Sequence, residues 1–125
     1  MRTIRGISRS LNNGGKLALL MGDFLDEFYR REWKERAAML AEEPAPTHPE
    51  SWHGPYLAAT AHKLANDSGL EPPQWAFNPA FSLPGDRPYI AERATGDLRS
   101  YYLLASPGEF KFRNIFTSPN CLSRV

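Results

Sequence analysis

Apolar residues recur at the spacing of an α-helix over the stretch that begins at Lys16. The apolar positions, three or four residues apart, are Leu17, Met21, Phe24 and Phe28. Residues at this spacing lie on one face of a helix. The pattern therefore predicts an amphipathic helix that packs this face against the core.

The same spacing continues from Trp33 to Leu40. The first helix therefore either runs on or restarts near Glu32. It ends before Pro44, because proline lacks the backbone N–H that a helix interior needs. Further prolines push the residues before them out of helical geometry, so we predict an extended connector over residues 44–51.

A second core helix is predicted after Gly54 and Pro55, which suit the start of a helix. Its apolar positions are Leu57, Ala61 and Leu64. Residues 66–69 read Asn-Asp-Ser-Gly and supply the stop, since glycine favours the left-handed conformation that commonly ends a helix.

Residues 70–96 contain five prolines with large aromatic side chains between them. The aromatic residues are Trp75, Phe77, Phe81 and Tyr89. We expect an ordered, irregular loop that is held in place by aromatic packing. A loop of this length either carries function or packs its own side chains, and the pattern leaves both alternatives open.

Residues 97–125 hold further helix-start signals. Asp97 can cap a helix that runs to Ala105. Ser106 and Glu109 match the capping box of a short helix that follows. The one stretch that suggests a strand is residues 114–117.

The first 15 residues carry three arginines and no acidic residue, and they end in Asn-Asn-Gly-Gly. Such a cluster breaks regular structure, so we predict a flexible basic arm over residues 1–15 and a single helical domain over residues 16–125. The fold class is mostly α. We expect a compact single domain of about four or five helices with a long ordered loop rich in proline and aromatic residues.

Composition excludes several classes of protein. The 125 residues are 42% hydrophobic and 23% charged, which is close to the globular average. The net charge of +1 gives no general argument for binding nucleic acid or an anionic membrane. No apolar stretch approaches the ~20 residues of a membrane-spanning helix. A chain with one cysteine, Cys121, cannot form an internal disulfide, so we predict a cytoplasmic protein with no membrane partner.

Residues with catalytic or metal-binding chemistry form no recognisable motif. The histidines are His48, His53 and His62, and their spacing does not bring them to one point as a zinc site requires. The carboxylates Asp23, Asp26 and Glu27 precede basic residues on the same helix, which is typical of a solvated, ion-paired face. The chain also lacks a phosphate-binding loop and a nucleophile motif. We therefore predict no catalytic residue, no cofactor, no metal and no enzymatic activity.

Several strings of residues along the chain resemble a bacterial family. The strings are Asp26-Glu27-Phe28-Tyr29-Arg30, Met39-Leu40-Ala41-Glu42-Glu43-Pro44, Tyr56-Leu57-Ala58-Ala59, His62-Lys63-Leu64-Ala65, Pro72-Pro73-Gln74-Trp75, Phe110-Lys111-Phe112-Arg113-Asn114-Ile115-Phe116 and Leu122-Ser123-Arg124. Over residues 16–125 the chain resembles small helical proteins of actinobacteria. These form the region behind the helix-turn-helix of regulators or antitoxins that are encoded beside nucleotidyltransferase-like toxins.

The resemblance implies an antitoxin-like or regulatory module whose partner is a protein such as a nucleotidyltransferase-like toxin. It carries over no catalytic residue. Among the positions that match are Arg113 and Asn114, which lie between aromatic residues near the chain end. We infer two alternatives for them: an internal latch on backbone carbonyls of the Pro-rich loop, or a surface that faces a partner.

We therefore predict a non-enzymatic protein-interaction module, with a homodimer left open. The candidate partner-binding residues are Trp33, Trp52, Trp75 and Arg113. Exposed tryptophans would act as anchors, because aromatic anchors dominate interface energies. The prediction fails if all three tryptophans are buried in the monomer.

Two other functions remain open. In the first, a small ligand-binding protein or enzyme has a pocket under residues 70–96, where Asp23, Glu27, His62 or Arg113 converge. In the second, the basic ends of the chain bind nucleic acid through phosphate contacts and aromatic stacking.

Overall fold

The computed structural model describes residues 1–48 and 51–124. In chain order its elements are α1 (Ile4–Asn12), α2 (Leu17–Arg30), α3 (Trp33–Ala41), α4 (His53–Asp67), η1 (Gln74–Phe77), η2 (Pro79–Phe81), β1 (Tyr89–Ile90), η3 (Ala91–Arg93), α5 (Gly96–Ala105), α6 (Gly108–Lys111) and β2 (Ile115–Phe116), where η marks a 3-10 helix. The predicted mostly α fold is confirmed.

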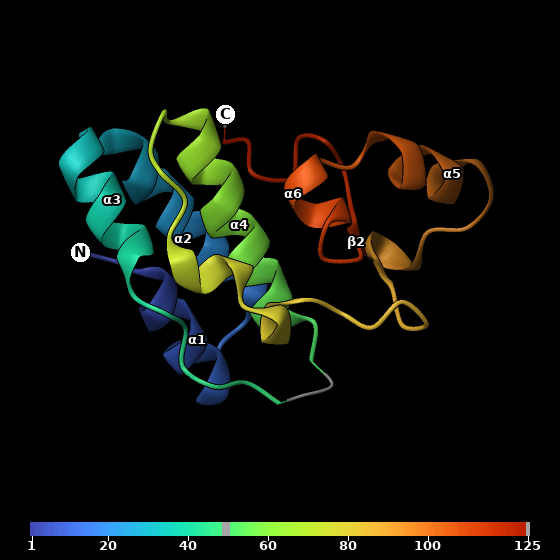
Figure 1. Ribbon diagram of the computed structural model, residues 1–125, viewed down its shortest axis with the longest axis horizontal. Helices are drawn as coiled ribbons and strands as arrows, with labels where there is room; N and C mark the ends of the chain where they lie inside the picture. Colours follow the sequence, from blue (N-terminus) through green and yellow to red (C-terminus); the bar gives the residue numbers. More distant parts are fainter. Residues whose placement is uncertain (49–50, 125) are drawn as a thin grey trace.

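Helices α1 to α4 form a bundle, and α5, α6 and β2 form a smaller lobe beside it (Figure 1). One hydrophobic core joins the two, because Phe110 and Ile115 of the lobe are buried in the same cluster as Phe24, Leu57 and Leu64 of the bundle. Helix α4 is central: it packs against α1, α3, α6 and the 3-10 helices η1 and η2 of the Pro-rich loop.

The predicted helices of the bundle are confirmed. Met21, Phe24 and Phe28 of α2 are buried, and the two phenylalanine rings stack at 5.9 Å between centroids. The helix ends at Arg30 and α3 restarts at Trp33, with extended backbone between them.

Helix α4 ends where the Asn-Asp-Ser-Gly run predicts. The helix stops at Asp67, and Gly69 adopts the left-handed conformation at φ +70°. The connector is free of helix at residues 44–48 and 51, while residues 49–50 lie outside the described part of the chain.

The prediction of a flexible N-terminal arm is wrong. Residues 4–12 form α1, Thr3 caps it by accepting a hydrogen bond from the Gly6 amide, and Ile4 and Ile7 are buried. The three arginines suggested a solvated arm, but two of them, Arg2 and Arg5, form ion pairs with acidic residues later in the chain. Arg2, for example, contacts a Glu27 carboxylate oxygen at 3.1 Å. Residues 1–15 therefore belong to the helical domain.

The Pro-rich loop is ordered, as predicted, and it pairs with the chain end. Strand β1 lies parallel to β2, with Tyr89 opposite Ile115. The strand expected within residues 114–117 is thus confirmed as β2.

The predicted capping box of α6 is wrong. No side chain among the described residues caps α6. The Ser106 hydroxyl instead accepts a hydrogen bond at 2.8 Å from the amide of Thr117, which directly follows β2. Helix α5 begins at Gly96 without a side-chain cap, and Asp97 lies in its first turn.

Candidate functional site

The three tryptophans have different environments. Trp33 is 63% exposed, whereas Trp52 and Trp75 are half-buried. Trp52 stacks on Tyr89, with 4.0 Å between ring centroids, and meets Tyr56 edge-on. Trp52 therefore serves internal packing, and Trp33 is the tryptophan that is free to contact a partner.

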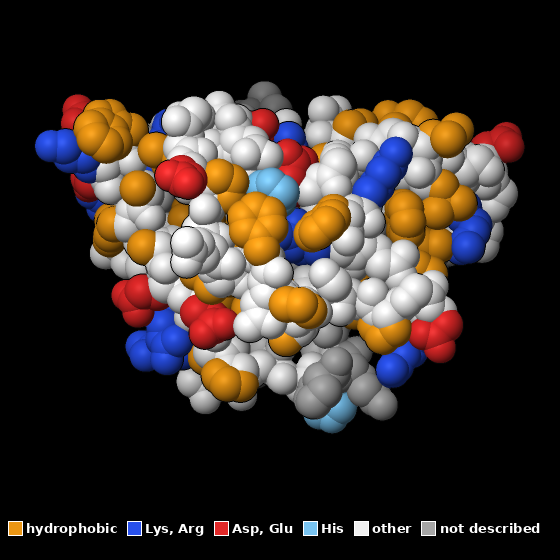
Figure 2. Space-filling view, in the orientation of Figure 1, with side chains coloured by type: hydrophobic (Ala, Val, Ile, Leu, Met, Phe, Trp, Pro, Cys, Tyr) orange, Lys and Arg blue, Asp and Glu red, His pale blue; other side chains and the backbone are white. Residues whose placement is uncertain are grey.

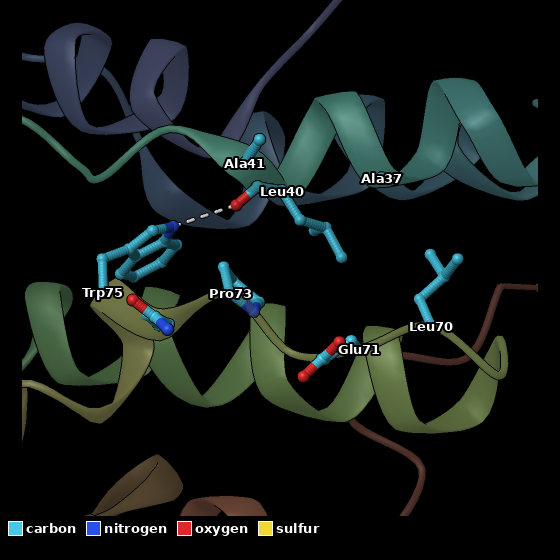
Figure 3. A pocket seen from close by; sticks show the side chains of 8 residues that line it. Ala37, Leu40, Ala41, Leu70, Glu71, Pro73 and Trp75 are labelled. Atoms are coloured by element: carbon cyan, nitrogen blue, oxygen red, sulfur yellow. Dashed lines mark hydrogen bonds between the residues drawn. The ribbon is translucent and has the colours of Figure 1, made fainter.

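A groove of about 370 Å³ separates α3 from residues 70–75, which include the start of η1. Its walls are formed by Ala37, Leu40 and Ala41 on α3 and by Leu70, Glu71, Pro73, Gln74 and Trp75 opposite. In Figure 3, Leu40 and Leu70 point from opposite sides into the space between the two walls. The groove is therefore lined mainly by apolar side chains.

The sequence of each wall explains why the groove stays open. Alanines on α3 are too short to fill the space. On the facing wall, Pro72 and Pro73 keep the chain extended and lack the N–H groups that would pair with a neighbour.

At one end the groove is closed by Trp75, whose indole N–H donates to the Leu40 carbonyl at 3.0 Å. The last carbonyls of a helix have no partner inside it. Trp75 thus satisfies one of these groups and fixes the distance between the walls (Figure 3).

Trp33 extends the apolar surface of the groove along α3. Trp33, Ala37 and Ala41 follow one another at intervals of four residues, so they share one face of the helix. All three are exposed. We define the groove together with the exposed Trp33 ring as the α3 groove surface.

The mouth of the groove carries negative charge. Glu71 is the one acidic residue among the lining side chains, and no basic group of the described residues forms an ion pair with it. Lys34 lies 5.5 Å from the centroid of the Trp33 ring, at the far end of the surface. The arrangement offers apolar contact area with one acidic group at its edge.

Arg113 lies inside the fold, and its side chain is fully buried. Its guanidinium donates to the backbone carbonyls of Ala76 at 2.7 Å and Glu109 at 2.8 Å, and it meets His62 Nδ1 at 3.1 Å. Burial lowers the pKa of Arg113 to about 10. Of the two alternatives for this residue, the internal latch is confirmed.

Asn114 completes the latch. Its side-chain amide donates to the Pro84 carbonyl at 2.6 Å, and its backbone carbonyl accepts from the Tyr89 amide at 3.1 Å. Both acceptor segments belong to the Pro-rich loop, so the chain end holds this loop against the bundle.

The four residues expected to converge in a catalytic pocket do not meet. His62 and Arg113 are in contact, but Asp23 is exposed on α2 and Glu27 pairs with Arg2 and Arg31. Burial by itself would raise the pKa of Glu27. Hydrogen bonds from these two arginines outweigh this effect, so the pKa of Glu27 is lowered and its carboxylate stays ionised. This carboxylate therefore acts as an ion-pair partner.

A second cavity, of about 580 Å³, lies between the bundle and the lobe under the end of the Pro-rich loop. Trp52, Tyr56, Tyr89 and Cys121 are among its lining residues. Burial raises the pKa of the Cys121 thiol to about 11, so the thiol stays protonated near neutral pH and is a poor nucleophile.

Several basic groups near the ends of the chain are engaged within the fold, whereas Arg9 is exposed on α1. Arg5 donates to the Glu43 carbonyl, Arg124 pairs with Asp26 at 2.8 Å, and Lys111 donates to the Leu104 carbonyl. Among residues 1–48 and 51–124, no three metal-binding side chains come together, and no helix is long and apolar enough to span a membrane.

No family model, no curated protein and no solved structure matches the chain. The function must therefore be inferred from the geometry of its own surfaces. Sequence reasoning missed Leu40, Leu70 and Pro73 as parts of one groove. The sequence held only part of the signal, as paired prolines before Trp75 and alanines four and eight residues after Trp33.

Proposed function

We propose that this protein is a non-enzymatic interaction module that binds a partner protein through the α3 groove surface. The observation that carries the proposal is the exposed Trp33 ring on the same helix face as the two alanines that line the groove. An exposed tryptophan beside an apolar groove has the composition of an interface hot spot.

The groove suits a segment of a protein better than a small polar metabolite. Metabolite sites hold several convergent polar groups, whereas this groove has one carboxylate, Glu71, and a glutamine at its edge. A complementary segment would insert a bulky apolar side chain beside Leu40 and Leu70 and place a lysine or arginine near Glu71. Such a segment is an amphipathic helix with a basic flank.

The biological setting in this proposal is regulatory, in the manner of an antitoxin. The resemblance described above makes a nucleotidyltransferase-like toxin the first partner to test. A cytoplasmic location is part of the same proposal.

The test begins with purification of the tagged chain from its host with nuclease treatment and high salt. The protein that co-purifies is then prepared alone and titrated against the wild-type chain, Trp33→Ala, Ala37→Arg and the control Leu19→Ala. Trp33 and Ala37 belong to the α3 groove surface, whereas Leu19 is an equally exposed apolar residue on α2.

Loss of a tryptophan anchor costs about 2 kcal/mol or more, so Trp33→Ala should weaken binding by roughly 30-fold. Ala37→Arg should weaken it further by filling the mouth of the groove, and Leu19→Ala should bind like the wild type. Equal affinities for all four proteins would overturn the proposal. Recovery that depends on nucleic acid would also overturn it, in favour of binding through the basic chain ends.

The cavity under the Pro-rich loop supports a second candidate function, which is binding of a small ligand. The Tyr56 side chain lines it, and burial raises the pKa of Tyr56, so its hydroxyl stays a neutral hydrogen-bonding group. A filled cavity stabilises the folded state. Thermal unfolding in the presence of a metabolite library, repeated with a Cys121→Trp variant that blocks the cavity, distinguishes this function from partner binding.

A further inference from the structure

Helix α5 leaves most of its apolar side chains in contact with solvent. Tyr102 is its one buried residue, whereas Leu98 is 44% exposed, Tyr101 50% and Leu104 79%. Figure 2 shows hydrophobic side chains gathered at the right-hand end of the molecule, where Figure 1 places α5. Single exposed leucines are ordinary, but three apolar residues on one short helix form a patch.

The three exposed side chains form one stripe. Each follows the previous one by three residues, so Leu98, Tyr101 and Leu104 lie on the same side of α5. The stripe has a leucine at equal distance on either side of Tyr101. A two-fold axis at Tyr101 therefore places Leu98 of one copy against Leu104 of a second copy, in an antiparallel pair of helices.

Charges at the two ends of α5 fit the same arrangement. Asp97 lies in the first turn, and the Lys111 ammonium donates to the Leu104 carbonyl at 2.6 Å, at the other end of the helix. Antiparallel pairing brings Asp97 of one copy toward Lys111 of the second copy, twice by symmetry. It also sets the two helix dipoles in opposite directions, which is the favourable orientation.

The size of the stripe is compatible with a weak dimer. With about 200 Å² for each fully exposed side chain, it presents roughly 350 Å² of apolar surface. Specific interfaces are about 57% apolar, so this stripe suits an interface of roughly 600 Å² on each copy, about 1,200 Å² in total. This is the lower end of the range for specific pairs.

We infer that α5 is a self-association surface, through which two copies of the chain form a two-fold symmetric dimer. The contact is an antiparallel pair of α5 helices centred on Tyr101 and flanked by Asp97 and Lys111.

Sedimentation velocity of the full chain over a wide concentration range tests the dimer. The wild type should change from monomer to dimer as its concentration rises, and Leu104→Glu should remain monomeric. The control Leu19→Glu replaces a leucine that is 68% exposed on α2 and should dimerise like the wild type. A wild type that stays monomeric at several hundred micromolar, or loss of the dimer in Leu19→Glu alone, would overturn the inference.

Charge exchange and cross-linking test the geometry. Asp97→Lys should weaken the dimer at least several-fold, and the double variant Asp97→Lys with Lys111→Asp should restore it. In a Cys121→Ser background, Tyr101→Cys should form a covalent dimer on mild oxidation. Leu103→Cys, which lies on the other side of the same helix, should not. Equal cross-linking at both positions would contradict the antiparallel pair.

This inference does not depend on the proposed function. The α5 stripe lies on the lobe, whereas the α3 groove surface lies on the bundle (Figure 1). Leu104→Glu should therefore bind a partner protein with wild-type affinity per chain, and Trp33→Ala should dimerise normally. Failure of one proposal can thus be told from failure of the other.

Discussion

Replacement of Arg113 by methionine should destabilise the fold, because the latch loses its donor. The guanidinium makes hydrogen bonds with the backbone carbonyls of Ala76 and Glu109 and with His62 Nδ1 at 2.7, 2.8 and 3.1 Å. Methionine fills a similar unbranched space but donates no hydrogen bond. The substitution therefore changes polar contacts more than packing.

The size of the effect follows from these contacts. A buried carbonyl left without a donor costs about 1–3 kcal/mol. This cost applies in full to Ala76 and is an upper limit for the half-buried Glu109, so the two carbonyls together cost at most roughly 6 kcal/mol. The substitution also removes a buried cation, and desolvation of this cation lowers the pKa of Arg113 to about 10. It removes in addition the buried Arg113 Nε, which has no hydrogen-bond partner among the described residues. Relief of these two costs offsets part of the loss. We expect a net decrease of about 3 kcal/mol in the free energy of unfolding and a fall in Tm of roughly 10 °C.

Urea unfolding followed by circular dichroism and tryptophan fluorescence measures this change. The matched control is Arg9→Met, which removes the same guanidinium from an exposed position on α1. Surface substitutions usually change stability by less than about 0.5 kcal/mol. An Arg113→Met protein as stable as Arg9→Met would refute the reasoning.

Three further predictions concern the same region. Asn114 has φ +65° and donates to the Pro84 carbonyl, so Asn114→Ala should cost about 1 kcal/mol more than Asn114→Gly in urea unfolding, since glycine tolerates this conformation. Trp75→Phe removes the indole donor and should cost about 1 kcal/mol in the same assay. Burial, and next the Arg113 charge, lower the pKa of His62 below 6.5, against a smaller opposing effect of Glu109. As the pH falls, His62 therefore takes up a proton in the unfolded chain before it does so in the folded chain. The contribution of His62 to stability is thus present above pH 6.5 and is lost as the pH falls through the lower pKa of the folded state. His62→Asn, whose Oδ1 replaces Nδ1 as the acceptor, should flatten the dependence of Tm on pH between about pH 7 and 5.

The bundle was largely predictable because its helices carry repeated large apolar residues. Phe24 and Phe28 gave α2 a clear stripe, and glycine marked the end of α4. Helix α1 was missed because its stripe rests on two isoleucines among arginines. Those arginines become compatible with a packed helix only when acidic groups from later elements, such as Glu27, meet them.

The two candidate surfaces were predictable to different degrees. The latch was one of two alternatives for Arg113, because an arginine and an asparagine among aromatic residues suit backbone carbonyls. The α3 groove surface was not predictable, since it depends on a contact between Leu40 and Trp75, which are 35 residues apart. Periodic apolar residues in the sequence predict the individual helices, but they do not predict the distance between α3 and the facing wall of the groove.

Hydroxyl-radical footprinting of the chain with its co-purified partner tests the α3 groove surface most directly. Trp33 is 63% exposed, whereas Trp52 is half-buried against Tyr89, so the two rings provide a probe and an internal control in one molecule. Binding at the groove predicts a several-fold decrease in the oxidation rate of Trp33 and an unchanged rate for Trp52. An unchanged Trp33 rate in a saturated complex would contradict the proposed function.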